Sequence, residues 1–230
     1  MPESALSSSL LAAARVIDEA TDVETALQAI TNAAVISLPG IEHAGISLLR
    51  SDRSIETRGA TSDLPQQLDD LQFEFAEGPC FDAMLEGTDD LQVSNDIRHD
   101  QRWPRYVPRA VELGLKSQLG MRLFHSDQLY GALNLYSTEN DTIPEETVDG
   151  VQIFAAHAGA VLGRVVLEKN LRAAMATRTV IGVATGLIMG KYEVTQEQAF
   201  QYMSRISQDT NTKLREVAER IVQEVGPADA

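Results

Sequence analysis

The last third of the chain, residues 172–225, constrains the fold most, because it reads as three amphipathic helical segments with very short connections. Thr195 and Gln198 have the spacing of a capping box, which predicts that the second helix begins there. Gly190 predicts the end of the helix before it. The second helix is expected to bury Ala199, Phe200, Met203 and Ile206. A unit of about fifty residues is small for a self-sufficient core, so we expect support from an upstream helix or a partner chain.

These residues resemble the ANTAR domain, the RNA-binding output module of bacterial transcription antiterminators. The resemblance covers most of the unit without gaps. Its residues are Arg178, 180–182, 184–189, 199–200, 207–208, Asn211, 213–214 and 217–218. Many ANTAR domains have Lys where this sequence has Thr185, and the difference removes one cation from the expected RNA face.

The resemblance implies that the partner is RNA, in the form of paired hairpins with short loops. Recognition of bases in RNA loops needs cations, amides and stacking planes. The predicted RNA contacts are Arg178, Thr185, Lys191, Arg205, Gln208, Asn211, Lys213 and Arg215. For each Lys or Arg taken alone, the residue type favours a solvated surface charge, and the motif favours function for Arg178 and Lys213. Arg178 and Thr185 are seven residues apart and share one helix face.

The net charge of −15 argues at first against a nucleic-acid partner. The charge is unevenly distributed, since residues 1–164 contain 11 Lys and Arg against 26 Asp and Glu, while residues 165–230 contain 8 of each. A neutral domain can still present a local basic face. No uninterrupted run of eighteen apolar residues, no secretory signal and only one Cys occur in the sequence, so we expect a cytoplasmic protein without a membrane partner.

The N-terminal part alternates helices and strand pairs. Helices are predicted over 4–20 and 22–38, hairpins over 44–60 and 117–137, and a polar, turn-like segment over 61–71. This order, together with the phrases at 77–80, 103–104 and 131–136, resembles a GAF domain, a small-molecule sensor built on an antiparallel sheet. The fold class is therefore predicted as α+β, with a GAF-like sensor over 1–160, a linking helix over 161–176 and an ANTAR domain over 177–226.

The GAF resemblance implies a small-molecule ligand pocket that involves Phe75, Cys80, Phe81 and Trp103. The alternative is that these side chains are core residues that fill the space themselves. No cofactor, metal site or catalytic motif is predicted, because no His or Cys has ligand spacing and no nucleophile motif occurs. We therefore expect a protein that is not an enzyme, with a redox switch at Cys80 as an alternative.

A long helix is predicted from about residue 144 into the C-terminal unit, since no Pro interrupts the apolar pattern. Val151, Phe154, Ala158, Val161 and Val165 alternate at spacings of three and four, which is typical of a coiled coil and favours a homodimer. The alternative is that this face packs on the sheet of the sensor. The resulting hypothesis is an RNA-binding antitermination regulator controlled by its sensor, and a DNA-binding regulator is the alternative.

Overall fold

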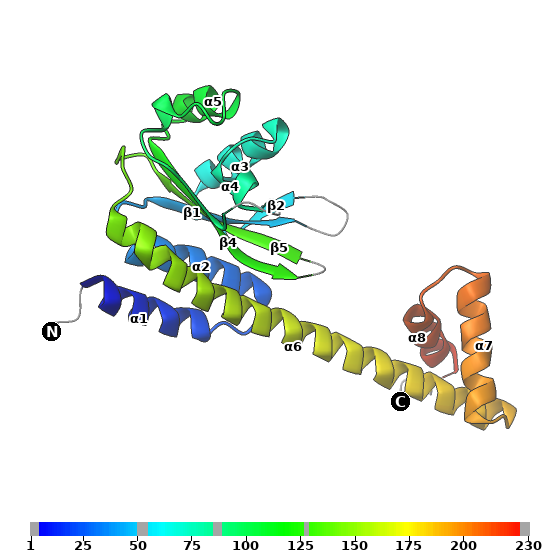
Figure 1. Cartoon of the computed structure of the whole chain (residues 1–230). Coiled ribbons are helices and arrows are strands. Elements are labelled where there is room, and N and C mark those ends of the chain that lie inside the picture. The colour runs from blue at the N-terminus through cyan, green and yellow to red at the C-terminus, as the bar shows by residue number, and fades with distance from the viewer. Residues whose placement is uncertain (1–4, 50–54, 85–88, 127–128, 226–230) are drawn as a thin grey trace. The chain divides into compact units, whose positions relative to one another are not determined.

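A computed structural model of the chain describes residues 5–49, 55–84, 89–126 and 129–225. The chain divides into two compact units, Met1–Val166 and Leu167–Ala230, which we call the N-terminal unit and the C-terminal unit. The N-terminal unit is a sheet with helices on both faces, and the C-terminal unit consists of helices (Figure 1). The predicted α+β class is confirmed, and so is the long helix, which is α6 (Glu145–Tyr192).

The sheet of the N-terminal unit has five antiparallel strands in the order β2-β1-β5-β4-β3. The strands are β1 (His43–Leu49), β2 (Ile55–Arg58), β3 (Leu91–Ser94), β4 (Ser117–Ser126) and β5 (Leu129–Ser137). Both predicted hairpins are present, and the central pair sets Ser47 of β1 opposite Ala132 of β5. The connections within the two hairpins, residues 50–54 and 127–128, lie outside the described part of the chain.

One face of the sheet is apolar and is covered by α2 (Val23–Ser37) and the first part of α6, and α1 (Ala5–Asp18) packs against α2 on the side away from the strands (Figure 1). The residues of α6 in this core are Val151, Phe154, Ala158, Val161 and Val165, none more than 5% exposed. The coiled-coil prediction for this stripe is therefore wrong, and the alternative that it packs on the sheet is correct. An apolar sheet face has to be buried, and this helix stripe covers it.

The other face of the sheet is covered by α3 (Asp63–Phe75), α4 (Pro79–Met84) and α5 (Tyr106–Glu112), with the 3-10 turn η1 (Ile97–His99) beside them (Figure 1). These elements come very close to the strands. A Cβ added to Gly120 of β4 would lie 2.7 Å from the carbonyl oxygen of Pro79, and one added to Gly45 of β1 would lie 3.0 Å from Pro65. Glycine on the strands therefore lets helix backbone and sheet backbone approach each other.

Helix α3 corrects the prediction that residues 61–71 are turn-like, since the helix begins at Asp63. Its buried side includes Asp69 and Gln72 as well as Leu68, so the apolar spacing that signals a helix is interrupted by polar residues. Pro65 lies in the first turn, where it is tolerated.

The C-terminal unit packs the end of α6 against α7 (Gln196–Asp209) and α8 (Leu214–Val225). Its core residues are Ala184, Ile188, Ala199, Met203, Val217 and Ala218. The capping box of Thr195 and Gln198 is present. Two predictions fail. Helix α6 runs past Gly190 and ends where Glu193 adopts a left-handed conformation, with φ of 51°. Phe200 is 45% exposed because it lies beside the buried face of α7 and not on it.

Helix α6 is long and apolar enough, by length and composition alone, to cross a membrane, with a mean hydropathy of 1.5 over its most apolar window. Half of that window is buried inside the protein. One such helix is weak evidence for a membrane span, because the core helix of a soluble domain has the same properties.

Candidate nucleic-acid interface

A groove of about 710 Å³ lies between α6 and α7 within the C-terminal unit. Its lining residues on α6 are Arg178, Ile181, Gly182, Thr185, Gly186 and Met189, and those on α7 are Gln196, Glu197 and Phe200. The α6 residues recur at spacings of three and four, so one continuous helix face forms one wall of the groove. We call this surface the α6–α7 groove.

The α6 wall of the groove contains two glycines, Gly182 and Gly186, one helical turn apart. A Cβ added to either residue would meet no heavy atom within 4 Å. Glycine within a helix costs about 1 kcal/mol relative to alanine. Because nothing within the described chain occupies the space that these glycines leave, packing inside the protein does not explain them.

The side chains of the groove differ in charge and exposure. Arg178 is exposed and has no ion pair within the ranges that the structure describes. Glu197 is the groove's carboxylate, on the first turn of α7. Phe200 presents 45% of its surface to solvent. Thr185 is only 7% exposed, and its hydroxyl donates a hydrogen bond to the Ile181 carbonyl oxygen at 2.7 Å.

The structure brings together Arg178 and Thr185 of the eight predicted RNA contacts, and the other six lie outside the groove lining. These six are Lys191, Arg205, Gln208, Asn211, Lys213 and Arg215, all exposed. Arg215 forms an ion pair with Glu219 at 2.7 Å, and this carboxylate partly neutralises its positive charge. Lys213 immediately precedes α8, where the first backbone N–H groups of the helix lack intrahelical partners.

The short connection between α7 and α8 is held in one shape by hydrogen bonds. The hydroxyl of Ser207 donates to the Thr212 carbonyl oxygen at 2.6 Å, and the Thr212 N–H donates to the Ser207 carbonyl oxygen at 3.0 Å. Asn211 adopts the left-handed conformation between them, with φ of 49°. Ser207 and Asn211 therefore shape this turn, whatever else they contact.

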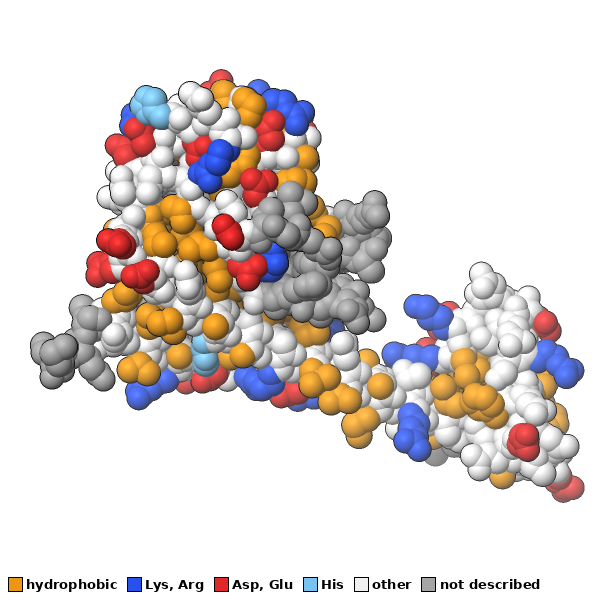
Figure 2. Space-filling model, in the orientation of Figure 1, with side chains coloured by type: hydrophobic (Ala, Val, Ile, Leu, Met, Phe, Trp, Pro, Cys, Tyr) orange, Lys and Arg blue, Asp and Glu red, His pale blue; other side chains and the backbone are white. Residues whose placement is uncertain are grey.

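Sequence reasoning missed Phe200, Met189, Gln196 and Glu197 as members of the groove. The spacing of Arg178, Gly182 and Gly186 was a readable signal for one wall. The α7 wall was not readable, because Phe200 adjoins the buried positions of its helix. Figure 2 shows Lys and Arg side chains around hydrophobic side chains on the visible face of the C-terminal unit.

The residues that were predicted to line a ligand pocket in the N-terminal unit lie in different packing environments. Trp103 is 2% exposed and donates from Nε1 to Asp82 Oδ2 at 2.9 Å. Phe75 is half-buried beside the same hydrophobic cluster as Trp103. Phe81 is half-buried and meets Phe73 edge to face, with ring centroids 6.4 Å apart. A ligand pocket formed by Phe75, Cys80, Phe81 and Trp103 stays a prediction.

The covered polar face of the sheet is organised around the buried carboxyl of Asp69. It accepts hydrogen bonds from Ser47 Oγ at 2.7 Å, Thr57 Oγ1 at 2.8 Å, Asn134 Nδ2 at 3.0 Å, and from the Tyr136 hydroxyl. Burial raises the pKa of Asp69, and the hydrogen bonds from Tyr136, Ser47, Thr57 and Asn134 oppose that rise. The sequence did not reveal this cluster, because its members come from four separate elements.

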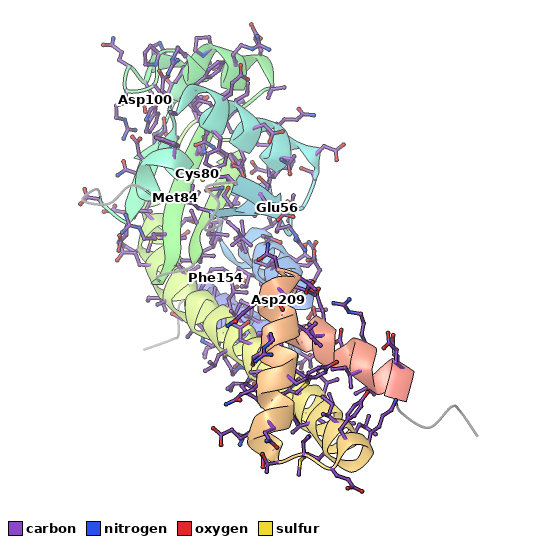
Figure 3. The ribbon with its side chains drawn as sticks, turned by 90° about the vertical axis from the view of Figure 1, so that its right-hand side faces the viewer. Glu56, Cys80, Met84, Asp100, Phe154 and Asp209 are labelled. Carbon is purple, nitrogen blue, oxygen red and sulfur yellow. The ribbon has the colours of Figure 1, made fainter. Side chains whose placement is uncertain are left out.

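Cys80 lies at the edge of this cluster and is fully buried (Figure 3). Its thiol donates to Ser47 Oγ at 3.4 Å, and its backbone N–H donates to Gln72 Oε1 at 2.9 Å. Burial, and then the nearby Asp69 charge, raise the pKa of the Cys80 thiol well above its ordinary value. A buried thiol with a raised pKa is a poor nucleophile, so the site does not favour a redox switch.

Two buried polar atoms on the same sheet face have no hydrogen-bond partner among the described residues, namely Gln118 Nε2 and Asn134 Oδ1. Gln118 accepts a hydrogen bond from the Tyr106 hydroxyl through its other amide atom, at 2.5 Å. Buried polar atoms usually have a partner, and an exception needs an explanation. One donor and one acceptor therefore remain available inside the N-terminal unit.

The Glu77 side chain explains part of the 77–80 motif. Its carboxylate accepts hydrogen bonds from the backbone N–H of Arg105 at 2.8 Å and of Tyr106 at 3.1 Å, and from Arg105 Nε at 2.8 Å. Burial opposes the shift, but these hydrogen bonds lower the pKa of Glu77 overall. Glu77 thus fixes the start of α5, and this residue of the motif has a structural role.

The comparisons agree with both resemblances. A GAF domain model matches residues 20–163, and an ANTAR domain model matches residues 169–222. A search of curated proteins found no match.

Three solved structures show the fold. The GAF domain of a Coxiella burnetii phosphoenolpyruvate-protein phosphotransferase has a TM-score of 0.55 at 16% identity, covering 72% of this chain and 97% of its own. The GAF domain of the Acinetobacter phosphotransferase has a TM-score of 0.53 at 12% identity, covering 73% and 99%. The R. palustris bacteriophytochrome RpBphP3 has a TM-score of 0.57 at 12% identity over 88% of this chain, which spans only 47% of that structure. The chain belongs to the GAF domain family and carries an ANTAR domain after its GAF domain, as a GAF-ANTAR regulator does.

Proposed function

We propose that the chain is a transcription antitermination regulator whose C-terminal unit binds hairpin loops in nascent transcripts and so prevents a terminator from forming. The observation that carries the proposal is the α6–α7 groove, which combines an exposed cation, Arg178, with an exposed aromatic ring, Phe200. Splayed loop bases are recognised by such cations and stacking planes. The ANTAR match supplies the class of RNA-binding module.

The charge distribution supports RNA binding by the C-terminal unit alone. Residues 167–230 contain 8 Lys and Arg and 8 Asp and Glu, whereas residues 1–166 contain 11 against 26. An acidic sensor repels phosphate, and the neutral unit can concentrate a few cations on one face. Contact with RNA is thereby restricted to a small surface.

The test is a binding titration of the full chain with fluorescent hairpin RNAs, first selected by crosslinking and sequencing of bound transcripts. Arg178→Ala is expected to weaken binding about tenfold, the loss of one charge-assisted contact. Arg172→Ala is the matched control, because Arg172 is also an exposed cation of α6 but lies outside the groove and is paired with Glu168. Duplex DNA that competes as well as hairpin RNA would favour the DNA-binding alternative instead.

The same proposal includes a homodimer, which suits a target with paired hairpins because two linked contacts raise avidity. In the C-terminal unit, Leu167, Leu171 and Met175 recur every four residues on α6 and are 59%, 55% and 70% exposed. This stripe supports dimerisation in place of the buried stripe that the sequence suggested. Leu171→Glu should convert the dimer to a monomer in light scattering, and an unchanged mass would exclude this stripe.

The proposal gives the N-terminal unit a sensing role, without catalysis and in the cytoplasm. Gln118 Nε2 and Asn134 Oδ1 support a small polar ligand that accepts from one atom and donates to the other. A cell extract of small molecules should raise the melting temperature of the wild type but not that of Gln118→Leu. An equal rise in melting temperature in both proteins would show that the ligand does not bind at Gln118.

A further inference from the structure

We propose that the α6–α7 groove holds one unpaired nucleobase of the RNA loop, stacked on Phe200 above the bare helix backbone at Gly182 and Gly186. The inference rests on the proposed RNA function and adds the ligand class and the residue that holds it. It also divides the groove into a part that contacts the base and a part that contacts the phosphate.

The Phe200 ring offers a stacking surface in the groove. Helix α7 buries Ala199 and Met203 completely, yet the larger Phe200 keeps 45% of its surface exposed in the groove. An exposed aromatic side chain on a wall of a groove is available to a planar ligand. Nucleobases stack on aromatic side chains with little dependence on base identity, since every base has a π face.

The two glycines of the α6 wall support the same inference independently of Phe200. Each costs helix stability, and neither is required by packing, because an added Cβ would meet no heavy atom within 4 Å. Their absent side chains leave a flat strip of backbone along the α6 wall. A planar ring can approach such a strip closely, whereas a Cβ at either position would project into the space where the ring lies.

Charge orients the nucleotide. Arg178 lies at the beginning of the α6 row and Met189 at its end, while Glu197 lies on the α7 wall. A phosphate is attracted to the Arg178 guanidinium and repelled by the Glu197 carboxylate. The base is therefore directed toward α7, where the Glu197 carboxylate can accept a hydrogen bond from a base N–H and Gln196 can donate or accept one.

The experiment is a double-mutant cycle on the full chain. Wild type and Phe200→Leu are titrated with a bound hairpin and with the same hairpin made abasic at each loop position in turn. Phe200→Leu should weaken binding of the intact loop about 5- to 150-fold, the range of one base stack. At one position the abasic RNA should bind both proteins equally weakly. Phe200→Trp should restore the affinity, and circular dichroism checks that each variant is folded.

Tyr202→Leu is the matched control, because Tyr202 is 51% exposed on the same helix but faces a different groove. It should leave hairpin affinity unchanged. If Phe200→Leu binds every hairpin as tightly as the wild type, the inference is overturned while the proposed RNA function stands. If the wild type binds no hairpin, the proposed function fails and this inference fails with it.

Discussion

One glycine of the N-terminal unit and two of the C-terminal unit lie in opposite surroundings. At Gly120 in the sheet of the N-terminal unit, an added Cβ would meet the backbone of Pro79 at 2.7 Å and of Cys80 at 2.9 Å. At Gly182 and Gly186 in the C-terminal unit, it would meet nothing within 4 Å. The first glycine is required by contacts inside the protein. The other two leave space on the surface, and we infer that a partner uses it.

The same contrast holds for polar side chains. The N-terminal unit directs Asp69, Asn134 and Ser47 inward, where they hydrogen-bond to one another, whereas Arg178 and Lys213 of the C-terminal unit are exposed to solvent. The difference is that buried polar groups of the first unit pair with one another, whereas these two cations of the second unit remain exposed.

The largest effect is expected when the interior network loses its acceptor. Asp69→Ala leaves the donors of Ser47, Asn134 and Tyr136 buried without their partner, and each such donor costs about 1–3 kcal/mol. The free energy of unfolding of the N-terminal unit, measured in urea, should fall by at least about 3 kcal/mol. A loss below 1 kcal/mol would mean that water replaces the carboxylate easily.

Gly120→Ala should destabilise the same unit by about 1–3 kcal/mol, because the new methyl group collides with backbone that cannot move aside. Urea unfolding followed by tryptophan fluorescence reports on this unit, since Trp103 is the only tryptophan. A neutral result would break the claim that the sheet glycines are required by packing.

Gly186→Ala tests the opposite case. Helix propensity should raise the stability of the C-terminal unit by about 1 kcal/mol, seen by circular dichroism at 222 nm. Hairpin RNA affinity should fall at the same time, because the methyl group enters the groove. A variant that gains stability and keeps its full affinity would contradict the role given to the glycines.

The smallest effect is a pH dependence confined to the N-terminal unit. The pKa of Asp69 is raised in the folded state, so its contribution to stability is present below the ordinary value of 3.8 and is lost as pH rises through the raised pKa. Asp69→Asn lacks this titration. The difference in unfolding free energy, wild type minus Asp69→Asn, should therefore decrease with rising pH, and a difference that stays flat between pH 4 and 8 would contradict the raised pKa.

Local signals predicted much of the fold. The capping box at Thr195 and both strand pairs depend on neighbouring residues, so the sequence shows them directly. The failures came from tertiary context. Helix α3 was missed because Asp69 and Gln72 occupy buried positions that the apolar pattern cannot reveal.

The same reasoning applies to the sites. Arg178 and Thr185 were placed on one face from their spacing alone, and both line the groove. Phe200 could not be assigned, since a phenylalanine beside a buried alanine reads as core until the neighbouring helix is known. The stripe from Val151 to Val165 fitted both a coiled coil and a sheet-covering helix, and only the presence of the sheet decided between them.

The strand order has a consequence for synthesis of the protein. The central pair of the sheet joins β1 to β5, with Asn134 and Ser47 in hydrogen-bond contact 87 residues apart in sequence. During translation, one edge of β1 therefore stays unpaired until β5 has left the ribosome. Non-local pairing of this kind is slow and leaves strand edges exposed. The helices of the C-terminal unit make mostly local contacts, so the candidate RNA-binding surface can form quickly once these helices emerge.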